Sequence, residues 1–406
     1  MPREMKDSGI EWIGDIPSHW KTSKIKYYVD CWDGKRVPVD AGERVSGPYP
    51  YWGAGNITDY VNDYLFDEEL VLLGEDGAPF FDYTRPVAFL VNEKIWANNH
   101  IHVLKPHQNV CSSFLVHYLN HVDYKTYING SILNKLTQSN MNKIAFVVPP
   151  LSEQQAIADF LDTKCAEIDT VIEQTKATIE EYKKLKQSVI TEAVTKGIRG
   201  DRPIKDSGIE WIGDIPAEWD VIKLKYTSDF KQNKYSENDA ELRYIGLENI
   251  VAWNGQYMET DSVYDKEQSL ICDTNDVLFG KLRPYLAKVY ISPEKQCCSG
   301  EFCVIAIKEQ NTRYMWYQLI SHGFIFMVDR STYGTKMPRA NADYIKNMSV
   351  SIPPLSEQEE IAEYLDRKCA EIDTLIEKKT TLLTEIESFK KSLIFDYVTG
   401  KKEVIS

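Results

Sequence analysis

The chain has 406 residues, of which 43% are apolar and 12% aromatic, so it can bury the cores of two or three domains and is not intrinsically disordered. It has no apolar run of about 18 residues and no signal-peptide pattern, which excludes a membrane protein and predicts a cytoplasmic one. The net charge of -14 disfavours a protein that binds nucleic acid unaided through a broad basic surface.

The chain opens with a segment that is repeated later. The run DSGIEWIGDIP at residues 7–17 returns unchanged at residues 206–216. Such identity predicts two tandem units of about 200 residues. We expect each opening segment to be an aromatic staple that fixes the start of its unit. The repeat continues as Trp20 with Trp219, Lys24 with Lys223, and Lys26-Tyr27 with Lys225-Tyr226.

Behind each opening segment lie about 130 residues whose sequences differ greatly between the units. Short apolar runs predict strands there, and helical stretches near 113–119 and 312–321 interrupt them, which indicates an α+β domain. These variable segments are near neutral, with 12 basic and 14 acidic residues in 21–148 and 16 and 17 in 220–352. That balance is compatible with DNA binding that other subunits support. The expected strands are 71–73, 87–91, 144–148, 277–279, 289–291, 302–307 and 348–352.

In both units the variable segment is followed by the same motif, Pro-Pro-Leu-Ser-Glu-Gln, at residues 149–154 and 353–358. A Pro-Pro pair is extended, and Ser152 and Ser356 each fit the first position of a capping box, so a long helix is expected to begin here. Behind each cap, apolar residues recur every 3.5 residues on average over about five heptads, which is typical of a coiled coil. Each rod would be roughly 64 Å long and needs a partner, and the chain carries two.

The predicted seam leaves two positions open, because Leu185 or Lys186 fits the first helix and Phe389 or Lys390 the second. Two of the eight cysteines, Cys165 and Cys369, fall on the seam, and no CxxC pair occurs, so reduced buried thiols are expected. The core seam residues are Leu161, Ile168, Ile172, Ile179, Leu365, Ile372, Ile376 and Leu383. The predicted domains are residues 1–148 and 201–352, and each is followed by a long helix, at residues 149–200 and 353–406. Together they form a pseudo-twofold internal repeat.

Motifs for catalysis and metal binding are missing from the sequence. It has no convincing G-x-S-x-G, H-E-x-x-H, Walker, D/E-x-K or [DN]-P-P-[YF] arrangement. Gly53-Ala54-Gly55 lacks a third glycine and is expected to be a loop. We therefore expect no catalytic residues, no metal site and no enzyme activity in this chain.

The W-I-G-x-I-P-x-x-W segments, the I/V-P-P-L-x-E-Q words and the L-D-x-K-x-x-E-I-D helices together resemble the specificity subunit of type I restriction-modification enzymes over essentially the whole chain. The resemblance implies two target recognition domains, at 21–148 and 220–352, which read the halves of a bipartite, asymmetric double-stranded DNA sequence. It implies that the two long helices pair as an antiparallel coiled coil and set the gap between the halves.

The same resemblance implies a non-catalytic subunit of a host-defence system that works through partners. These are two methyltransferase subunits, which use S-adenosylmethionine, and ATP-driven restriction and translocation subunits. S-adenosylmethionine, ATP and magnesium are implied for those partners, and no cofactor is implied for this chain. A modification-only complex is the alternative within the same class. A structural protein with two ligand-free domains is the alternative from another class, and an enzyme ranks last.

Candidate DNA-binding residues lie in polar and aromatic loops, and each has a competing structural explanation. Tyr51 and Trp52 are expected in the core, Asn98 or Asn99 to cap a turn, and His100 to be a buried, hydrogen-bonded histidine. Lys281 with Arg283 is the best pair for a phosphate or a guanine, whereas Lys135, Lys336 and Arg339 favour phosphate. The full set is Tyr51, Trp52, Asn56, Asn98, Asn99, Ser131, Lys135, Gln138, Asn249, Lys281, Arg283, Tyr285, Glu301, Thr335, Lys336 and Arg339.

Overall fold

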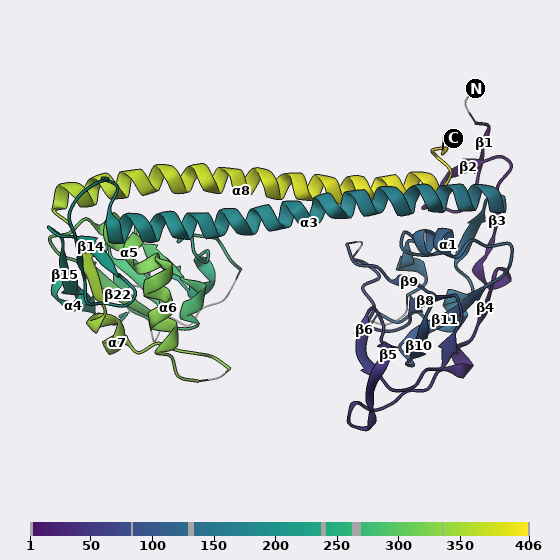
Figure 1. Ribbon diagram of the computed structural model, residues 1–406, viewed down its shortest axis with the longest axis horizontal. Helices are drawn as coiled ribbons and strands as arrows, with labels where there is room; N and C mark the ends of the chain where they lie inside the picture. The colour runs from purple at the N-terminus through teal and green to yellow at the C-terminus, as the bar shows by residue number, and fades with distance from the viewer. Residues whose placement is uncertain are drawn as a thin grey trace. The chain divides into compact units, whose positions relative to one another are not determined.

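The computed structural model describes residues 3–82, 84–128, 134–236, 241–261, 269–334 and 336–404. The chain forms two compact units: unit 1 holds Met1–Lys176 and Thr380–Ser406, and unit 2 holds Ala177–Lys379. Each unit is an α+β domain joined to one half of each of two long helices (Figure 1). The units do not end where the sequence repeats end, because both helices cross from one unit into the other.

The opening segment of each unit is a small antiparallel hairpin, and the next strand pairs with the strand that closes the variable segment. In unit 1 the hairpin is β1 (Met5–Asp7) with β2 (Asp15–Pro17), and the second pair is β3 (Lys21–Lys24) with β12 (Ala145–Val148). In unit 2 the same pairs are β13 (Ile204–Asp206) with β14 (Asp214–Pro216), and β15 (Asp220–Lys223) with β23 (Ser349–Ile352).

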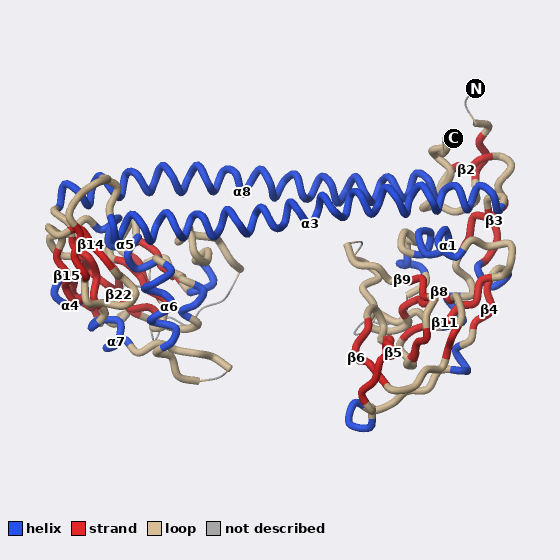
Figure 2. The backbone as a smooth tube through the Cα atoms, viewed as in Figure 1, coloured by secondary structure: helices blue, strands red, loops and turns tan. Residues whose placement is uncertain are grey.

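The variable segment of unit 1 folds into two four-stranded sheets (Figure 2). The first has the order β4-β11-β8-β9 and the second β6-β5-β10-β7. Their strands are β4 (Val29–Cys31), β5 (Ser46–Trp52), β6 (Ile57–Val61), β7 (Phe66–Asp67), β8 (Leu70–Gly74), β9 (Ala88–Val91), β10 (Lys94–Ala97) and β11 (Ile101–Pro106). Helices α1 (Ser112–Leu119) and α2 (Gln138–Met141) follow β11.

In the residues that the structure describes, unit 2 repeats this plan with three strands in its second sheet. The orders are β16-β22-β19-β20 and β17-β21-β18. The strands are β16 (Ser228–Lys231), β17 (Tyr244–Ile245), β18 (Leu270–Cys272), β19 (Val277–Gly280), β20 (Val289–Ile291), β21 (Gln296–Cys298) and β22 (Phe302–Ile307). The helices are α4 (Leu224–Thr227), α5 (Thr312–Ile320), α6 (His322–Arg330) and α7 (Ala342–Asn347). The predicted α+β class and the predicted strands are thus confirmed.

The long helices are α3 (Leu151–Lys196, 46 residues) and α8 (Leu355–Val398, 44 residues), and they run antiparallel in both units. In unit 1 the amino-terminal half of α3 shares a core with the carboxyl-terminal half of α8, and in unit 2 the halves are exchanged. None of the helices in the described residues is long and apolar enough to cross a bilayer. The residues in those shared cores are Leu161, Cys165, Ile394 and Val398 in unit 1, and Ile190, Ala193, Val194, Ile361, Leu365 and Cys369 in unit 2.

Lysine fills both of the open seam positions, since Lys186 and Lys390 turn inward while Leu185 and Phe389 remain exposed. Each lysine forms an ion pair with the opposite helix. Lys186 Nζ lies 2.7 Å from Asp373 in unit 2, and Lys390 Nζ lies 2.6 Å from Asp169 in unit 1. A polar pair within an apolar seam favours one register of the two helices over others.

The first turn of each long helix anchors the opening segment. Glu153 accepts hydrogen bonds from the Trp20 indole at 3.0 Å and from Arg3 at 2.8 Å. Glu357 accepts from the Trp219 indole at 3.1 Å and from Arg202 at 2.6 Å. Both tryptophans are fully buried.

The predicted capping residues were wrong. The helices begin at Leu151 and Leu355, and the carbonyls of Pro150 and Pro354 already accept the first N–H groups. Ser152 and Ser356 therefore lie inside the first turn and are exposed. The proline pair marks the start because its ring is compatible with the first helical turn but not with its continuation.

Replacing Glu357 with alanine should destabilise unit 2 by roughly 3 kcal/mol, because the buried Trp219 N–H and the Arg202 charge would lose their partner. Hydrogen exchange read by mass spectrometry would report faster exchange in unit 2. The matched control is Glu359→Ala, which removes an exposed carboxylate two residues away. Equal effects of the two substitutions would contradict the anchoring role.

Candidate nucleic-acid interface

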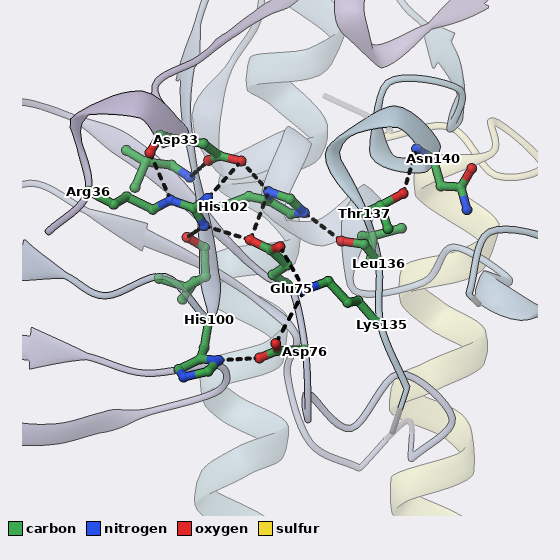
Figure 3. Close-up of polar contacts among 12 residues, drawn as sticks. Asp33, Arg36, Glu75, Asp76, His100, His102, Lys135, Leu136, Thr137 and Asn140 are labelled. Carbon is green, nitrogen blue, oxygen red and sulfur yellow. Dashed lines mark hydrogen bonds and ion pairs between the residues drawn. The ribbon is translucent and has the colours of Figure 1, made fainter. Parts of the chain in front are cut away.

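Three loop segments of unit 1 meet beyond the end of β8. The N–H of Glu75 donates to the carbonyl of His100 at 2.9 Å, and the N–H of Leu136 donates to the carbonyl of Glu75 at 2.6 Å. Asp76 and Lys135 face each other in a further antiparallel bridge. These bonds place Glu75, Asp76, His100 and Lys135, here cluster 1, side by side (Figure 3).

The side chains of cluster 1 are polar or charged and partly open to solvent. Lys135 Nζ lies 3.4 Å from Glu75 and 3.5 Å from Asp76, and the His100 Nδ1 is hydrogen-bonded to Asp76. His100 is 49% exposed and Lys135 46%, whereas Asp76 is 22% exposed. Cluster 1 thus offers both a carboxylate acceptor and the ammonium donor of Lys135 to a ligand that approaches the loops.

A buried ion network supports cluster 1 from the sheet side. His102 is fully buried, and its Nδ1 donates to Asp33 at 2.6 Å while its Nε2 donates to the Leu136 carbonyl at 2.8 Å. Arg36 lies 2.7 Å from Glu75 and 3.4 Å from Asp33. The hydrogen bond from His102, on strand β11, to the Leu136 carbonyl holds the segment that carries Lys135 against that strand (Figure 3).

The protonation of His102 follows from its partners. Burial acts to lower the pKa of His102, but its hydrogen bonds to Asp33, Cys31 and the Leu136 carbonyl and the Asp33 charge raise it to about 9. Burial also acts to raise the pKa of Asp33, yet His102, the Val103 N–H and Arg36 hold it below its usual value. The ring is therefore an imidazolium at neutral pH.

Cys31, Asp33 and His102 form the group of described residues whose ligand atoms are close enough to hold a metal, within 4.8 Å of one another. A metal-bound histidine must offer a nitrogen lone pair. Both nitrogens of His102 instead donate to oxygen atoms that only accept, and the Arg36 guanidinium already lies beside Asp33. The chemistry of this group favours a structural ion network over a metal centre.

Unit 2 builds a matching cluster from the same backbone positions. The Lys281 N–H donates to the Glu301 carbonyl at 2.8 Å, the Ala340 N–H donates to the Lys281 carbonyl at 2.9 Å, and Leu282 bridges Arg339. Cluster 2 is therefore Lys281, Leu282, Glu301 and Arg339, at the positions of Glu75, Asp76, His100 and Lys135 respectively. The backbone arrangement is shared, but a lysine replaces Glu75, a leucine replaces Asp76 and a glutamate replaces His100, while the position of Lys135 stays basic.

The side chains of cluster 2 are more donor-rich than those of cluster 1. Arg339 donates to Glu301 at 2.5 Å, and Lys281 Nζ donates to the Gly300 carbonyl at 2.8 Å. The other oxygen of Glu301, Oε2, is buried without a partner among the described residues. An open pocket of about 450 Å³ adjoins the cluster and is lined by Lys281 and Glu301 together with Phe230, Lys234, Tyr244 and Lys346.

The predicted DNA-binding residues fall into three groups. Tyr51, Trp52, Asn98 and Asn249 are at most 8% exposed and have structural roles. Asn98, for example, accepts the His100 N–H at 2.8 Å and caps a turn. Ser131 and Thr335 lie outside the described residues. The residues at the surface or at its edge are Asn56, Asn99, Lys135, Gln138, Lys281, Arg283, Tyr285, Glu301, Lys336 and Arg339.

Sequence reasoning missed the network under cluster 1. His100, expected to be buried, is exposed, and the buried histidine with satisfied hydrogen bonds is His102 instead. One signal was present, because His102 interrupts the apolar strand Ile101-His102-Val103-Leu104. A polar residue within such a strand requires a buried partner. Asp33 and Arg36 carried no comparable signal in the sequence.

The His102 network predicts a pH dependence of stability. Because folding raises the pKa of His102, protonated His102 stabilises the folded state fully at pH values below its unfolded-state pKa near 6.5. This stabilisation is lost as the pH rises through about 9. Between pH 7 and 10, the advantage of the wild type over His102→Gln in free energy of unfolding should shrink by about 2–3 kcal/mol. Denaturant titrations at both pH values measure it. The control is Asn99→Ala, which removes an exposed side chain that does not titrate and should show no such trend.

Comparisons with known proteins agree on one family. The family model described as "Type I restriction modification DNA specificity domain" matches residues 17–181 and 216–387. The type I restriction enzyme MjaVIII specificity subunit of Methanocaldococcus jannaschii is 23% identical over 96% of this chain and 94% of its own. The EcoDI specificity subunit of Escherichia coli is 24% identical over 96% and 90%.

A solved structure shows the same fold. It is described as "Structural basis underlying complex assembly and conformational transition of the type I R-M system". The chain matches it with a TM-score of 0.67 and 13% identity, over 95% of this chain and 99% of that one.

Proposed function

Because this chain belongs to the family of type I restriction-modification DNA specificity proteins, we propose that it is the DNA sequence-specificity subunit of such a complex. The observation that carries the proposal is the family match over both repeats. Each matched repeat contains an α+β domain that leads into a long helix. In this role, the chain recognises a bipartite, asymmetric double-stranded DNA target in the prokaryotic cytoplasm.

The reading regions of this proposal are the variable segments, residues 21–148 and 220–352, which follow the opening segments and precede the helix segments 149–200 and 353–406. Within them, clusters 1 and 2 are the best-supported base readers. They combine partial exposure with hydrogen-bonding groups that the backbone holds at equivalent places in the two units. Their side chains differ, so the half-sites differ.

The chemistry of each cluster favours a different base edge. In cluster 2, Arg339 and Lys281 supply the donors that recognise O6 and N7 of guanine. In cluster 1, the carboxylate of Asp76 is an acceptor for an exocyclic amino group such as cytosine N4. The exposed residues Asn56, Asn99, Gln138, Arg283, Tyr285 and Lys336 remain candidates for contacts to DNA around these clusters.

The proposed partners are two methyltransferase subunits and the restriction and translocation subunits, which would bring S-adenosylmethionine, ATP and magnesium. The chain itself would be non-catalytic and bind none of these. A surface for protein partners is present on the long helices. Leu382 and Phe389 lie seven residues apart on the part of α8 that belongs to unit 1 and are 40% and 56% exposed. An apolar stripe of this spacing fits the packing of a further helix.

Lengthening both long helices should change the gap of the target and leave its halves unchanged. One heptad inserted after Lys176 and one after Lys379, the unit boundaries, keeps the seam in phase and adds roughly 10 Å. At roughly 3.4 Å per base pair, the unread gap should grow by about three base pairs. Methylome sequencing of cells that carry the chain and its methyltransferase partner measures this. Altered half-site letters would contradict the spacer role.

Substitutions in the clusters should each relax one half-site. Arg339→Lys keeps the charge but loses the two-pronged donor, so discrimination for guanine at one position should fall roughly 5- to 100-fold. Asp76→Asn should shift preference at one position of the other half-site, since an amide recognises adenine. The same methylome sequencing reads both results.

The control for these variants is Lys308→Ala, which removes an exposed lysine paired with Asp229 in unit 2. It should leave every letter of the target unchanged. If Arg339→Lys and Asp76→Asn altered the same half-site, the assignment of one cluster to each half would be wrong. If the wild-type complex methylated no bipartite sequence at all, the proposed function itself would fail.

A further inference from the structure

An exposed group of side chains is identical in the two units although its neighbours are not. Lys24, Lys26 and Tyr27, here Lys-Tyr patch 1, return as Lys223, Lys225 and Tyr226, here Lys-Tyr patch 2. The residues just before the patches differ completely, Lys21-Thr22-Ser23 against Asp220-Val221-Ile222, and Tyr28 after patch 1 corresponds to Thr227. Within residues 21–28 and 220–227, the identity is therefore confined to the patch.

The backbone holds both patches in the same place. Each begins at the last residue of the strand that pairs with the closing strand of its unit. The N–H of Ile25 donates to the Ile144 carbonyl at 3.0 Å, and the N–H of Leu224 donates to the Met348 carbonyl at 2.8 Å. Ile25 and Leu224 are fully buried and fix the chain, so the lysines on either side point outward.

Packing does not explain why the exposed residues are identical. All four lysines are exposed, and Tyr27 and Tyr226 are 62% and 71% exposed. Each tyrosine ring contacts the preceding lysine, with the ammonium 4.8 Å or 5.2 Å from the ring centre. A side chain with this exposure contributes little to the fold, so both units are suited to the same external ligand.

The charge of the patches indicates an anionic ligand. In the part of the chain that the structure describes, none of the four lysines forms an ion pair, and Lys225 bonds the neutral Asn347 side chain at 2.9 Å. In unit 1 Lys143 joins Lys24 and Lys26 around a shallow pocket of about 400 Å³ that also contains Gln138. The described lining of this pocket contains three lysines and no carboxylate, which is notable in a chain of net charge -14.

In each unit one short helix connects a residue of the cluster to the patch. Lys135 of cluster 1 precedes α2 (Gln138–Met141), and Lys143 and the patch 1 pocket follow it. Arg339 of cluster 2 precedes α7 (Ala342–Asn347), and Asn347 at its end contacts patch 2. The four-residue helix α2 is only about 6 Å long. This length is comparable to the spacing of two nucleotides along a DNA strand, so neighbouring parts of one strand could contact the residues at the two ends of the helix.

We propose that the two Lys-Tyr patches bind backbone phosphates of the DNA beside each half-site without reading its sequence. The proposal rests on the proposed DNA-specificity function and adds a separate class of contact to it. Lysine ammonium groups and the tyrosine hydroxyl are donors that phosphate oxygens accept. The patches are identical because phosphates are the same at every half-site, whereas clusters 1 and 2 differ because the bases differ.

The test uses the complete complex of this chain with its methyltransferase partner. Three variants are compared with the wild type: Lys24→Ala with Lys26→Ala, Lys223→Ala with Lys225→Ala, and all four together. Affinity for cognate and scrambled duplexes is measured over a range of salt concentrations. Each lost phosphate contact should reduce the slope of log affinity against log salt by about 0.9, so each double variant should lose about 2. Cognate and scrambled DNA should weaken by the same factor.

The matched control removes two exposed lysines that are also repeated between the units. Lys164→Ala with Lys368→Ala breaks helix-surface pairs with Glu167 and Glu371, at 2.7 Å and 2.8 Å, and should leave the salt slope unchanged. Methylome sequencing should return the wild-type letters for every patch variant.

Three results would overturn the proposal. An unchanged salt slope in the fourfold variant would show that the patches do not touch phosphates. Changed methylome letters would make them base readers. Loss of methyltransferase assembly with an unchanged slope for the assembled fraction would make them a protein-docking surface. A wild-type complex that failed to prefer cognate DNA would instead count against the proposed function.

Discussion

The structure depends on one carboxylate at the start of each long helix, which is partly buried in Glu153 and fully buried in Glu357. Glu153 and Glu357 receive the indole N–H of Trp20 and Trp219, and an arginine from the start of the same opening segment neutralises each. Burial acts to raise the pKa of Glu153, but His19, Trp20 and Arg3 hold it below its usual value. Because these bonds join the first and last parts of a unit, the variable segment between them folds inside a closed frame.

The two units share the backbone hydrogen bonds of their loops but carry different side chains at the equivalent positions. The backbone bonds beyond β8 and β19 are equivalent, but an aspartate and a histidine in unit 1 occur where unit 2 has a leucine and a glutamate. Unit 1 stabilises its loops with the imidazolium of His102, which pairs with the strand residue before Gly74. In unit 2 the residue that pairs with the strand residue before Gly280 is Cys303, and it lines an open pocket. Shared backbone and different side chains are what a reader of two unlike sequences requires.

Much of the fold could be predicted because repeated sequence and heptad spacing are local signals. Both long helices, their apolar seams and the α+β class follow from such patterns. The helix caps were wrong because Pro150 and Pro354 supply the first carbonyl acceptors before Ser152 and Ser356 are reached. The candidate site was harder, since cluster 1 joins three segments distant in sequence, and the charge of His102 arises from partners at residues 31, 33 and 136.

The glutamine that follows each anchoring glutamate contacts the variable segment in an unusual way. Gln154 and Gln358 accept the main-chain N–H of Cys111 and Asn311, both at 2.9 Å, and donate to the carbonyls of Pro149 and Pro353. A main-chain N–H is present whatever the side chain, unless that residue is proline. Recombination between genes could therefore replace an entire variable segment and keep these bonds. Such exchange would let a lineage acquire new specificities without altering the frame that carries them.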